Sequence, residues 1–124
     1  MRLFKTRAFA RLIRKTDITD RALSVAVERA GKGLVDAELG SGLIKQRLSR
    51  QGQGRSGGYR AVIALRAGDR AFFLHSFAKS DRANISDIQL RSLCELAARY
   101  LALNNAQTDL LLKAGELIEV KHGT

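Results

Sequence analysis

The sequence predicts an α+β domain that consists of an N-terminal helical hairpin, an antiparallel β-sheet and a C-terminal amphipathic helix. Apolar residues first recur at helical spacing, then alternate with polar residues at period two, and return to helical spacing after residue 86. With 124 residues, 45% of them apolar, the chain has the length and composition of one domain with its own core. No internal repeat or linker indicates a second domain, so residues 1–124 are expected to fold as one unit.

Two short helices are expected at the N-terminus. Apolar residues on one helical face predict a first helix over about residues 5–15. Thr19 can cap a second helix, and Gly31 is the expected residue just beyond its C-terminus. Because the connection between the two helices is short, they should pack antiparallel or nearly so.

The alternating pattern and the turn residues in the middle of the chain predict strands joined by tight turns, which implies an antiparallel sheet. The Gly-rich segment over residues 52–58 is expected to be irregular, and residues 67–70 form a hairpin turn. The last strand is apolar on both faces apart from His75 and Ser76, so it should lie centrally in the sheet. The expected strands cover residues 34–39, 43–50, 59–66 and 71–78.

The best-defined helix follows the sheet, over residues 87–103. Ser86 and Gln89 form an S-x-x-Q capping box, and Ile85 and Leu90 are spaced for a hydrophobic staple. Two further segments are expected beyond it: a short helix over residues 105–115, and a terminal strand or docking tail over residues 117–120.

The chain is strongly basic, with 22 Lys and Arg against 12 Asp and Glu and a net charge of +10. The excess lies in residues 1–21 and in residues 45–82, where nine basic side chains face two acidic ones. A charge of this size attracts phosphate backbones or an acidic partner, although a merely solvated surface is the ordinary alternative.

Several classes of function are disfavoured. Cys94 is the single cysteine, so it forms no disulfide within the chain, and with His75 and His122 it makes no plausible zinc site. The GQGRSGG segment lacks the Lys-Ser/Thr ending and the following helix of a P-loop, so neither a metal nor a small-molecule cofactor is expected.

No membrane association is expected, because no apolar run approaches the roughly 20 residues that span a bilayer. The N-terminal run MRLFKTRAFARLIRK is basic and amphipathic but lacks the apolar region and cleavage site of a signal peptide. The expected compartment is therefore the cytoplasm.

Lys45 and Arg47 are candidates for a phosphate-binding surface. In a strand they point to the same side, roughly 6.6–6.8 Å apart, which is close to the spacing of successive phosphates. A solvated sheet face explains such pairs in most proteins. Together with Arg55 in the Gly-rich segment, the pair favours a concave site for phosphate, and the expected ligand is RNA.

Three runs of the sequence resemble the RelE/HigB/ParE superfamily of bacterial toxins: GLVDAELGSGLIKQRL, GRSGGYRAVIAL and FFLHSFAKSDRANIS. They most resemble the HigB-like branch of the RelE-like toxins of type II toxin–antitoxin systems. The resemblance covers about residues 20–104, which leaves residues 105–124 as a C-terminal extension. It implies a helical hairpin packed on a twisted antiparallel sheet, with the C-terminal helix over or beside it.

The resemblance also implies an activity and partners. These toxins cleave mRNA on the ribosome and are neutralised by a cognate antitoxin, usually encoded next door and here expected to be of helix-turn-helix type. Cleavage proceeds by attack of a ribose 2′-OH on the neighbouring phosphate, which needs a base, an acid and positive charge. The family pattern places the catalytic basic residues at Lys45, Arg47, Arg60, Lys79 and Arg82. Further RNA contacts are expected from Arg50, Arg55, Tyr59 and His75.

The sequence departs from the family pattern at one catalytic position, because Ile85 stands where a tyrosine is expected. Tyr59 and His75 remain as candidates for proton transfer. However, a histidine within an apolar strand is more often part of the core, and Tyr59 lies on the strand face opposite Arg60. Because the chain offers few groups for acid–base catalysis, Lys45 and Arg47 would have to assist the proton transfer.

Two alternatives to an mRNA endonuclease therefore stay open. One is a non-enzymatic poison of gyrase, as in the ParE members of the superfamily. The other is a catalytically weakened toxin-fold module that binds without chemistry of its own.

Overall fold

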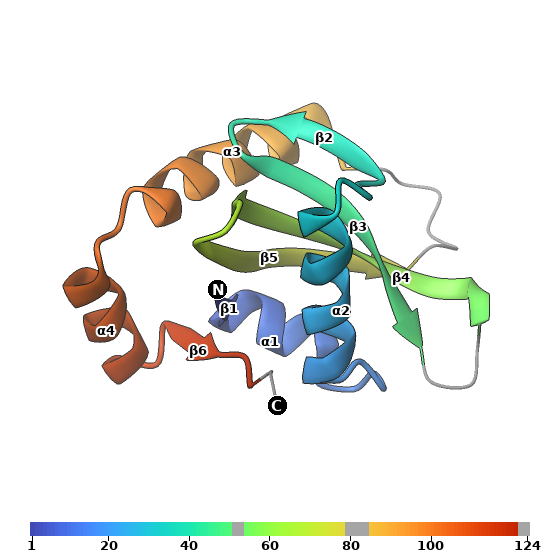
Figure 1. The fold of residues 1–124 in the computed structure, drawn as a ribbon, viewed down its shortest axis with the longest axis horizontal. Helices are drawn as coiled ribbons and strands as arrows, with labels where there is room; N and C mark the ends of the chain where they lie inside the picture. The colour runs from blue at the N-terminus through green and yellow to red at the C-terminus, as the bar shows by residue number, and fades with distance from the viewer. Residues whose placement is uncertain (51–53, 79–84, 122–124) are drawn as a thin grey trace.

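The computed structural model describes residues 1–50, 54–78 and 85–121, which form a mixed six-stranded sheet with helices over both faces (Figure 1). The strand order is β2-β3-β4-β5-β1-β6. The strands are β1 (Arg2–Thr6), β2 (Ala37–Gly40), β3 (Leu43–Arg50), β4 (Gly54–Arg66), β5 (Arg70–Ala78) and β6 (Leu117–Glu119). The helices are α1 (Arg7–Ile13), α2 (Asp20–Gly31), α3 (Asp87–Leu101) and α4 (Asn105–Lys113).

The prediction of an antiparallel sheet is correct for β2 to β5 and wrong at the other edge. There β1 pairs in parallel with β5, and β6 pairs antiparallel with β1. Strand β1 could not be predicted from the sequence because its two apolar residues are buried on opposite faces of the sheet. Leu3 lies in the core beneath α1 and α2, and Phe4 lies in the core beneath α3. A short strand covered on both faces shows no alternation of apolar and polar residues.

The predicted N-terminal helical hairpin also needs correction. The first helix is only seven residues long and follows directly on β1 at Thr6, whose hydroxyl accepts a hydrogen bond from the amide of Phe9 at 3.1 Å. The two helices share a core, but α1 mainly contacts β5 whereas α2 mainly contacts β3. Each helix is thus held chiefly by the sheet, because the residues expected to begin the first helix pair with β5 instead.

Most of the other predicted elements are confirmed, with shifts at their ends. Thr19 caps α2 and Ser86 caps α3, each by accepting a hydrogen bond from the amide three residues later. The residue with positive φ after α2 is Gly33, at 82°, rather than Gly31. The Gly-rich segment is partly regular, since β4 begins at Gly54, and residues 51–53 lie outside the described residues.

The sheet separates two cores. Ile63 and Phe73 lie in the core beneath α1 and α2, whereas Val62 and Phe72 lie in the core beneath α3. All four side chains are fully buried, and β5 is covered on both faces as its composition predicted. The rings of Phe72 and Tyr100 stack at 5.1 Å, which helps to hold α3 on its face of the sheet.

A buried glutamine ties α2 to the sheet. Gln46 of β3 is fully buried, and its Oε1 accepts a hydrogen bond from the amide of Asp36 at 2.9 Å. Its Nε2 donates to the carbonyls of Ala26, at 2.9 Å, and Leu34, at 3.0 Å. A buried amide is tolerated when its hydrogen bonds are satisfied, so Gln46 holds α2 and the entry to β2 at a fixed position on β3.

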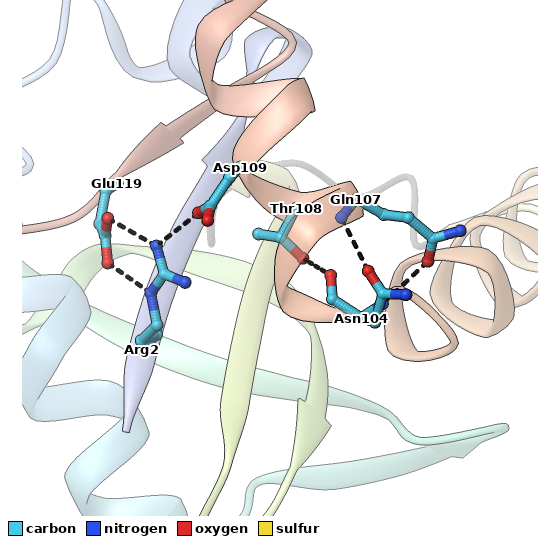
Figure 2. A network of polar contacts seen from close by, with 6 residues as sticks. All are labelled: Arg2, Asn104, Gln107, Thr108, Asp109 and Glu119. Carbon is cyan, nitrogen blue, oxygen red and sulfur yellow. Dashed lines mark hydrogen bonds and ion pairs between the residues drawn. The ribbon is translucent and has the colours of Figure 1, made fainter.

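At the far edge of the sheet, polar contacts join both ends of the described chain (Figure 2). Arg2 of β1 forms ion pairs with Glu119 of β6 at 2.9 Å and with Asp109 of α4 at 3.5 Å. Asn104 and Gln107 form a reciprocal capping box at the start of α4, as Figure 2 shows. These contacts hold α4 and β6 against β1. Among the described residues, no helix is long and apolar enough to cross a membrane.

We expect Gln46→Leu to lower the free energy of unfolding by about 1–3 kcal/mol, because it leaves buried hydrogen-bonding groups without their partner. The measurement is urea denaturation followed by circular dichroism. Gln107→Ala is the matched control: its side chain is exposed and makes one capping bond, worth about 1 kcal/mol or less. Equal losses in the two variants would show that Gln46 does not anchor α2.

Candidate nucleic-acid interface

The basic residues of β3 and β4 lie on the sheet face that α3 partly covers. Lys45 and Arg47 alternate with Gln46, whose side chain points to α2, so they share the face of Leu43 in the core beneath α3. On β4, Arg60 shares its face with Val62 of the same core. The period-two pattern predicted that Lys45 and Arg47 share one side of their strand, and the pairing of β3 with β4 adds Arg60 to that face.

The pairing of strands arranges this face in two rows that run across three strands. The first row consists of Lys45, Val62 and His75, and the second of Arg47, Arg60 and Phe77. Neighbouring strands lie about 4.8 Å apart, so the backbones at the two ends of each row are separated by about 10 Å. We call these six residues the basic face. Arg60 is central in its row, with cations from β3 on one side and aromatic rings from β5 on the other.

Arg60 carries an unsatisfied polar group. Its Nη1 atom is buried and has no hydrogen-bond partner among the described parts of the chain. A buried guanidinium nitrogen without a partner loses its hydration and gains nothing in return. Arg60 as a whole is only half-buried, so an anion can contact its guanidinium, and a phosphate would do so with the bidentate geometry that guanidinium prefers.

Arg47 is held by a carboxylate from the segment that leads into β2. Its backbone amide donates to Oδ2 of Asp36 at 2.6 Å, and its Nε lies 3.5 Å from the same oxygen. The other carboxylate oxygen lies 3.7 Å from Nη2 of Arg29 on α2. Asp36 thus restrains Arg47 and lowers the positive charge at this end of the basic face.

His75 lies on the basic face and is half-buried, rather than enclosed in the core. Its Nε2 lies 3.4 Å from the side-chain nitrogen of Gln89, and its ring centroid lies 6.1 Å from that of Phe77. Burial lowers the pKa of His75 below its ordinary value of 6.5, so the imidazole is neutral at neutral pH.

Gln89 was not identified as a site residue from the sequence. It occupies the third position of α3, and the capping-box pattern already accounted for it there. Its backbone amide does donate to the hydroxyl of Ser86, at 3.1 Å. Its side chain instead lies beside His75, and no pattern in the sequence signals this contact.

The remaining predicted site residues are placed differently. Tyr59 packs against the core beneath α1 and α2, so it lies on the face opposite Arg60, as its position in the strand indicated. Arg50 ends β3 and Arg55 lies near the start of β4, but their side chains are outside the described part of the structure. Lys79 and Arg82 fall in residues 79–84, which lie outside it altogether.

No metal centre competes with this interpretation within the described residues, where no three His, Cys, Asp or Glu side chains group closely enough to hold an ion. The described site consists instead of cations, one neutral imidazole and the buried nitrogen of Arg60. Such a site can bind an anion and exchange protons with it.

Comparison with known families identifies the class of protein to which this fold and its basic face belong. A family model described as the RelE toxin of the RelE / RelB toxin-antitoxin system matches residues 1–120. The chain therefore belongs to the RelE toxin family, and membership implies an antitoxin partner. The match includes β1, which the sequence did not reveal, and β6, which it predicted as a terminal strand or docking tail. No curated protein matches the chain.

We expect His75 to titrate below pH 6.5. The chain has two histidines, so His122→Gln leaves a single imidazole whose midpoint can be read by NMR. The depressed pKa also sets the sign of its effect on folding: the unfolded chain binds the proton first, so stability contributed at neutral pH is lost as the pH falls through 6.5 toward the folded-state pKa. A midpoint at or above 6.5 would contradict the half-buried, uncharged environment described here.

Proposed function

We propose that this chain is the toxin of a type II toxin–antitoxin system and acts as a ribosome-dependent mRNA endonuclease of the HigB-like branch. The observation that carries the proposal is the basic face, in which Lys45, Arg47 and Arg60 converge and Arg60 presents a buried nitrogen without a partner. A phosphodiester is the ligand that best satisfies this arrangement, because it offers negative charge and paired acceptor oxygens.

The cleavage reaction assigns a task to each cation. As the 2′-oxygen attacks, negative charge builds on the non-bridging oxygens of the phosphate, and positive side chains fixed in advance stabilise it. Arg60 is placed for this role at the centre of its row, with Lys45 and Arg47 on the neighbouring strand. Lys79 and Arg82 join the site by their match to the family pattern. Arg50 and Arg55 would extend the path of the RNA beyond the end of β3.

The antitoxin is proposed to cover this same charge. A domain with a net charge of +10 should bind an acidic or amphipathic segment, and the binding should weaken as salt screens the charges. We retain the expectation of a helix-turn-helix antitoxin encoded beside the toxin, in the cytoplasm where both would be made. Identification of the adjacent reading frame tests this directly.

The gyrase-poison alternative predicts a different use of the surface. A protein target requires a complementary interface, but it does not require three clustered cations, one of which has a guanidinium nitrogen without a hydrogen-bond partner. That feature favours RNA over a protein target. A catalytically weakened binding module would retain the same cations, so only a test of cleavage separates it from a nuclease.

We expect expression of the chain to arrest growth and to create new 5′ ends in total RNA, without induction of a DNA-damage reporter. The double change Lys45→Ala with Arg47→Ala should relieve the arrest. Arg60→Ala alone should lower the cleavage rate by about 10²–10³-fold, as expected when one charge-stabilising donor is removed.

The matched control removes two exposed cations at the ends of α2, Arg21 in its first turn and Lys32 just beyond its last residue. The variant Arg21→Ala with Lys32→Ala should leave arrest and cleavage unchanged. Arrest that survives the Lys45/Arg47 double change would show that the basic face is not the site. Arrest with a DNA-damage response and no new 5′ ends would favour the gyrase poison. Absence of cleavage by the wild-type chain on ribosomes would leave the binding module.

A further inference from the structure

A β-bulge in β5 decides where His75 points. Residues Ala71 and Phe73 face α1 and α2, and strict alternation would place His75 on that same side, within the core. The register shifts between Val62 and Ile63 of β4, which pair with His75 and Phe73 respectively, so Leu74 is an extra residue. Leu74 packs in the core beneath α3, and His75 contacts Gln89 of α3. Two consecutive side chains thus face α3.

This bulge has a consequence for chemistry. Bulges are enriched next to active sites, where they redirect a side chain that regular pairing would point elsewhere. Here the redirected residue is the one side chain of the basic face that can accept a proton at neutral pH, since its neighbours Lys45, Arg47 and Arg60 are cations. A core position for His75 would have required no irregularity in β5.

The position of His75 relative to the cations fits an in-line reaction. Lys45 on β3 and His75 on β5 occupy the two ends of one row, and β4 with Arg60 runs between them. Attack by a 2′-oxygen and departure of a 5′-oxygen take place on opposite sides of the phosphorus, so the base and the acid must also stand on opposite sides. Arg60 lies two residues from Val62 on β4, so a phosphate bound between the two rows would contact Arg60 with Lys45 on the β3 side and His75 on the β5 side.

Gln89 is placed to fix which nitrogen of the His75 imidazole carries the proton. Its side-chain nitrogen can only donate, so a hydrogen bond at this contact would make Nε2 of His75 the acceptor and leave the ring proton on Nδ1. At 3.4 Å the contact is long for a hydrogen bond, so a substrate hydroxyl can replace it readily.

We propose that His75 is the general base of the cleavage reaction and that Gln89 is the residue that positions it; this rests on the proposed nuclease function. The 2′-hydroxyl proton passes to Nε2 of His75 as the bond from the 2′-oxygen to phosphorus forms. The bond from phosphorus to the 5′-oxygen breaks, and that oxygen takes a proton from the ammonium group of Lys45. The products are a 2′,3′-cyclic phosphate and a 5′-hydroxyl, and Arg60 neutralises the charge on the non-bridging oxygens.

The surroundings of His75 favour its neutral form. Burial lowers its pKa, and the charged groups that face it from the strands, Lys45, Arg47 and Arg60, are all positive. In the first turns of α3, Asp87 and Arg91 are exposed at the surface, and Gln89 provides the contact to the ring. The imidazole is therefore ready to accept a proton at neutral pH, as a general base must be.

The test uses the full chain, ribosomes and an mRNA with one mapped cleavage site. We expect His75→Ala to lower the single-turnover cleavage rate by about 10²–10⁴-fold and added imidazole to restore part of it. His75→Gln, which keeps a polar side chain of similar size but cannot act as a base, should show the same loss. This second variant keeps the test valid if His75→Ala folds poorly.

A sulfur-for-oxygen substitution at the 5′ position of the scissile bond separates the two proton transfers. A thiolate leaves without a proton, so this substrate should restore cleavage by Lys45→Ala and should not restore cleavage by His75→Ala. For Gln89→Ala we expect kcat to fall about tenfold with KM unchanged. The ¹⁵N NMR signals of the His75 ring should at the same time lose their bias toward the Nδ1-protonated tautomer.

The outcomes separate this inference from the proposed function. If the wild-type chain cleaves and folded His75→Gln cleaves within about twofold of it, the histidine assignment is wrong and the nuclease stands. If cleavage is lost but imidazole rescues nothing and the sulfur substrate restores His75→Ala, His75 is not the base. If the wild-type chain cleaves no RNA on ribosomes, the proposed function itself fails.

Discussion

The pairing register of β4 between β3 and β5 determines which side chains meet beneath the N-terminal end of α3. A slip of one residue would turn Arg60 into the core and expose its apolar neighbours on the opposite face. The register is held by burial on both faces, since Ala61 and Val62 are each completely enclosed. It is also held by the hydroxyl of Ser76, which donates to the carbonyl of Arg60 at 3.0 Å. The geometry of the basic face follows from these contacts.

The clustered cations of the basic face lower the stability of the folded chain in this region. Three cations on adjacent strands repel one another, and the buried nitrogen of Arg60 lacks a partner among the described residues. Asp36 relieves part of the repulsion through Arg47. The remainder is relieved when an anion binds, so RNA or an acidic antitoxin segment should stabilise the folded chain in proportion to its affinity. Under the proposed function, RNA cleavage and antitoxin binding would depend on the same uncompensated charge.

The sequence was informative where one physical signal dominated. Alternation at period two placed Lys45 and Arg47 on one side of β3, and capping residues located the starts of α2 and α3. It failed where the signal was absent or ambiguous. Five residues of β1, buried on both faces, show no period, and the parallel pairing with β5 leaves no local trace.

The site was harder to predict than the fold because one irregular residue changes it. The bulge at Leu74 arises from the pairing of two strands, so alternation within β5 alone assigns His75 to the wrong face. Gln89 satisfied a helix-capping pattern and therefore carried no further signal, although its side chain serves another contact. The side chains that meet on the basic face depend on the pairing register of neighbouring strands, and the sequence of a single strand does not reveal that register.

The most direct measurement of the central claim is NMR mapping of a bound oligonucleotide that cannot react. An mRNA fragment with a 2′-O-methyl group at the scissile position retains its phosphates and loses the attacking hydroxyl. The account predicts that the largest shifts fall on Lys45, Arg47 and Arg60 of the sheet and extend to His75 and Gln89. Shifts centred on the exposed surface of α2, with the basic face unchanged, would contradict it.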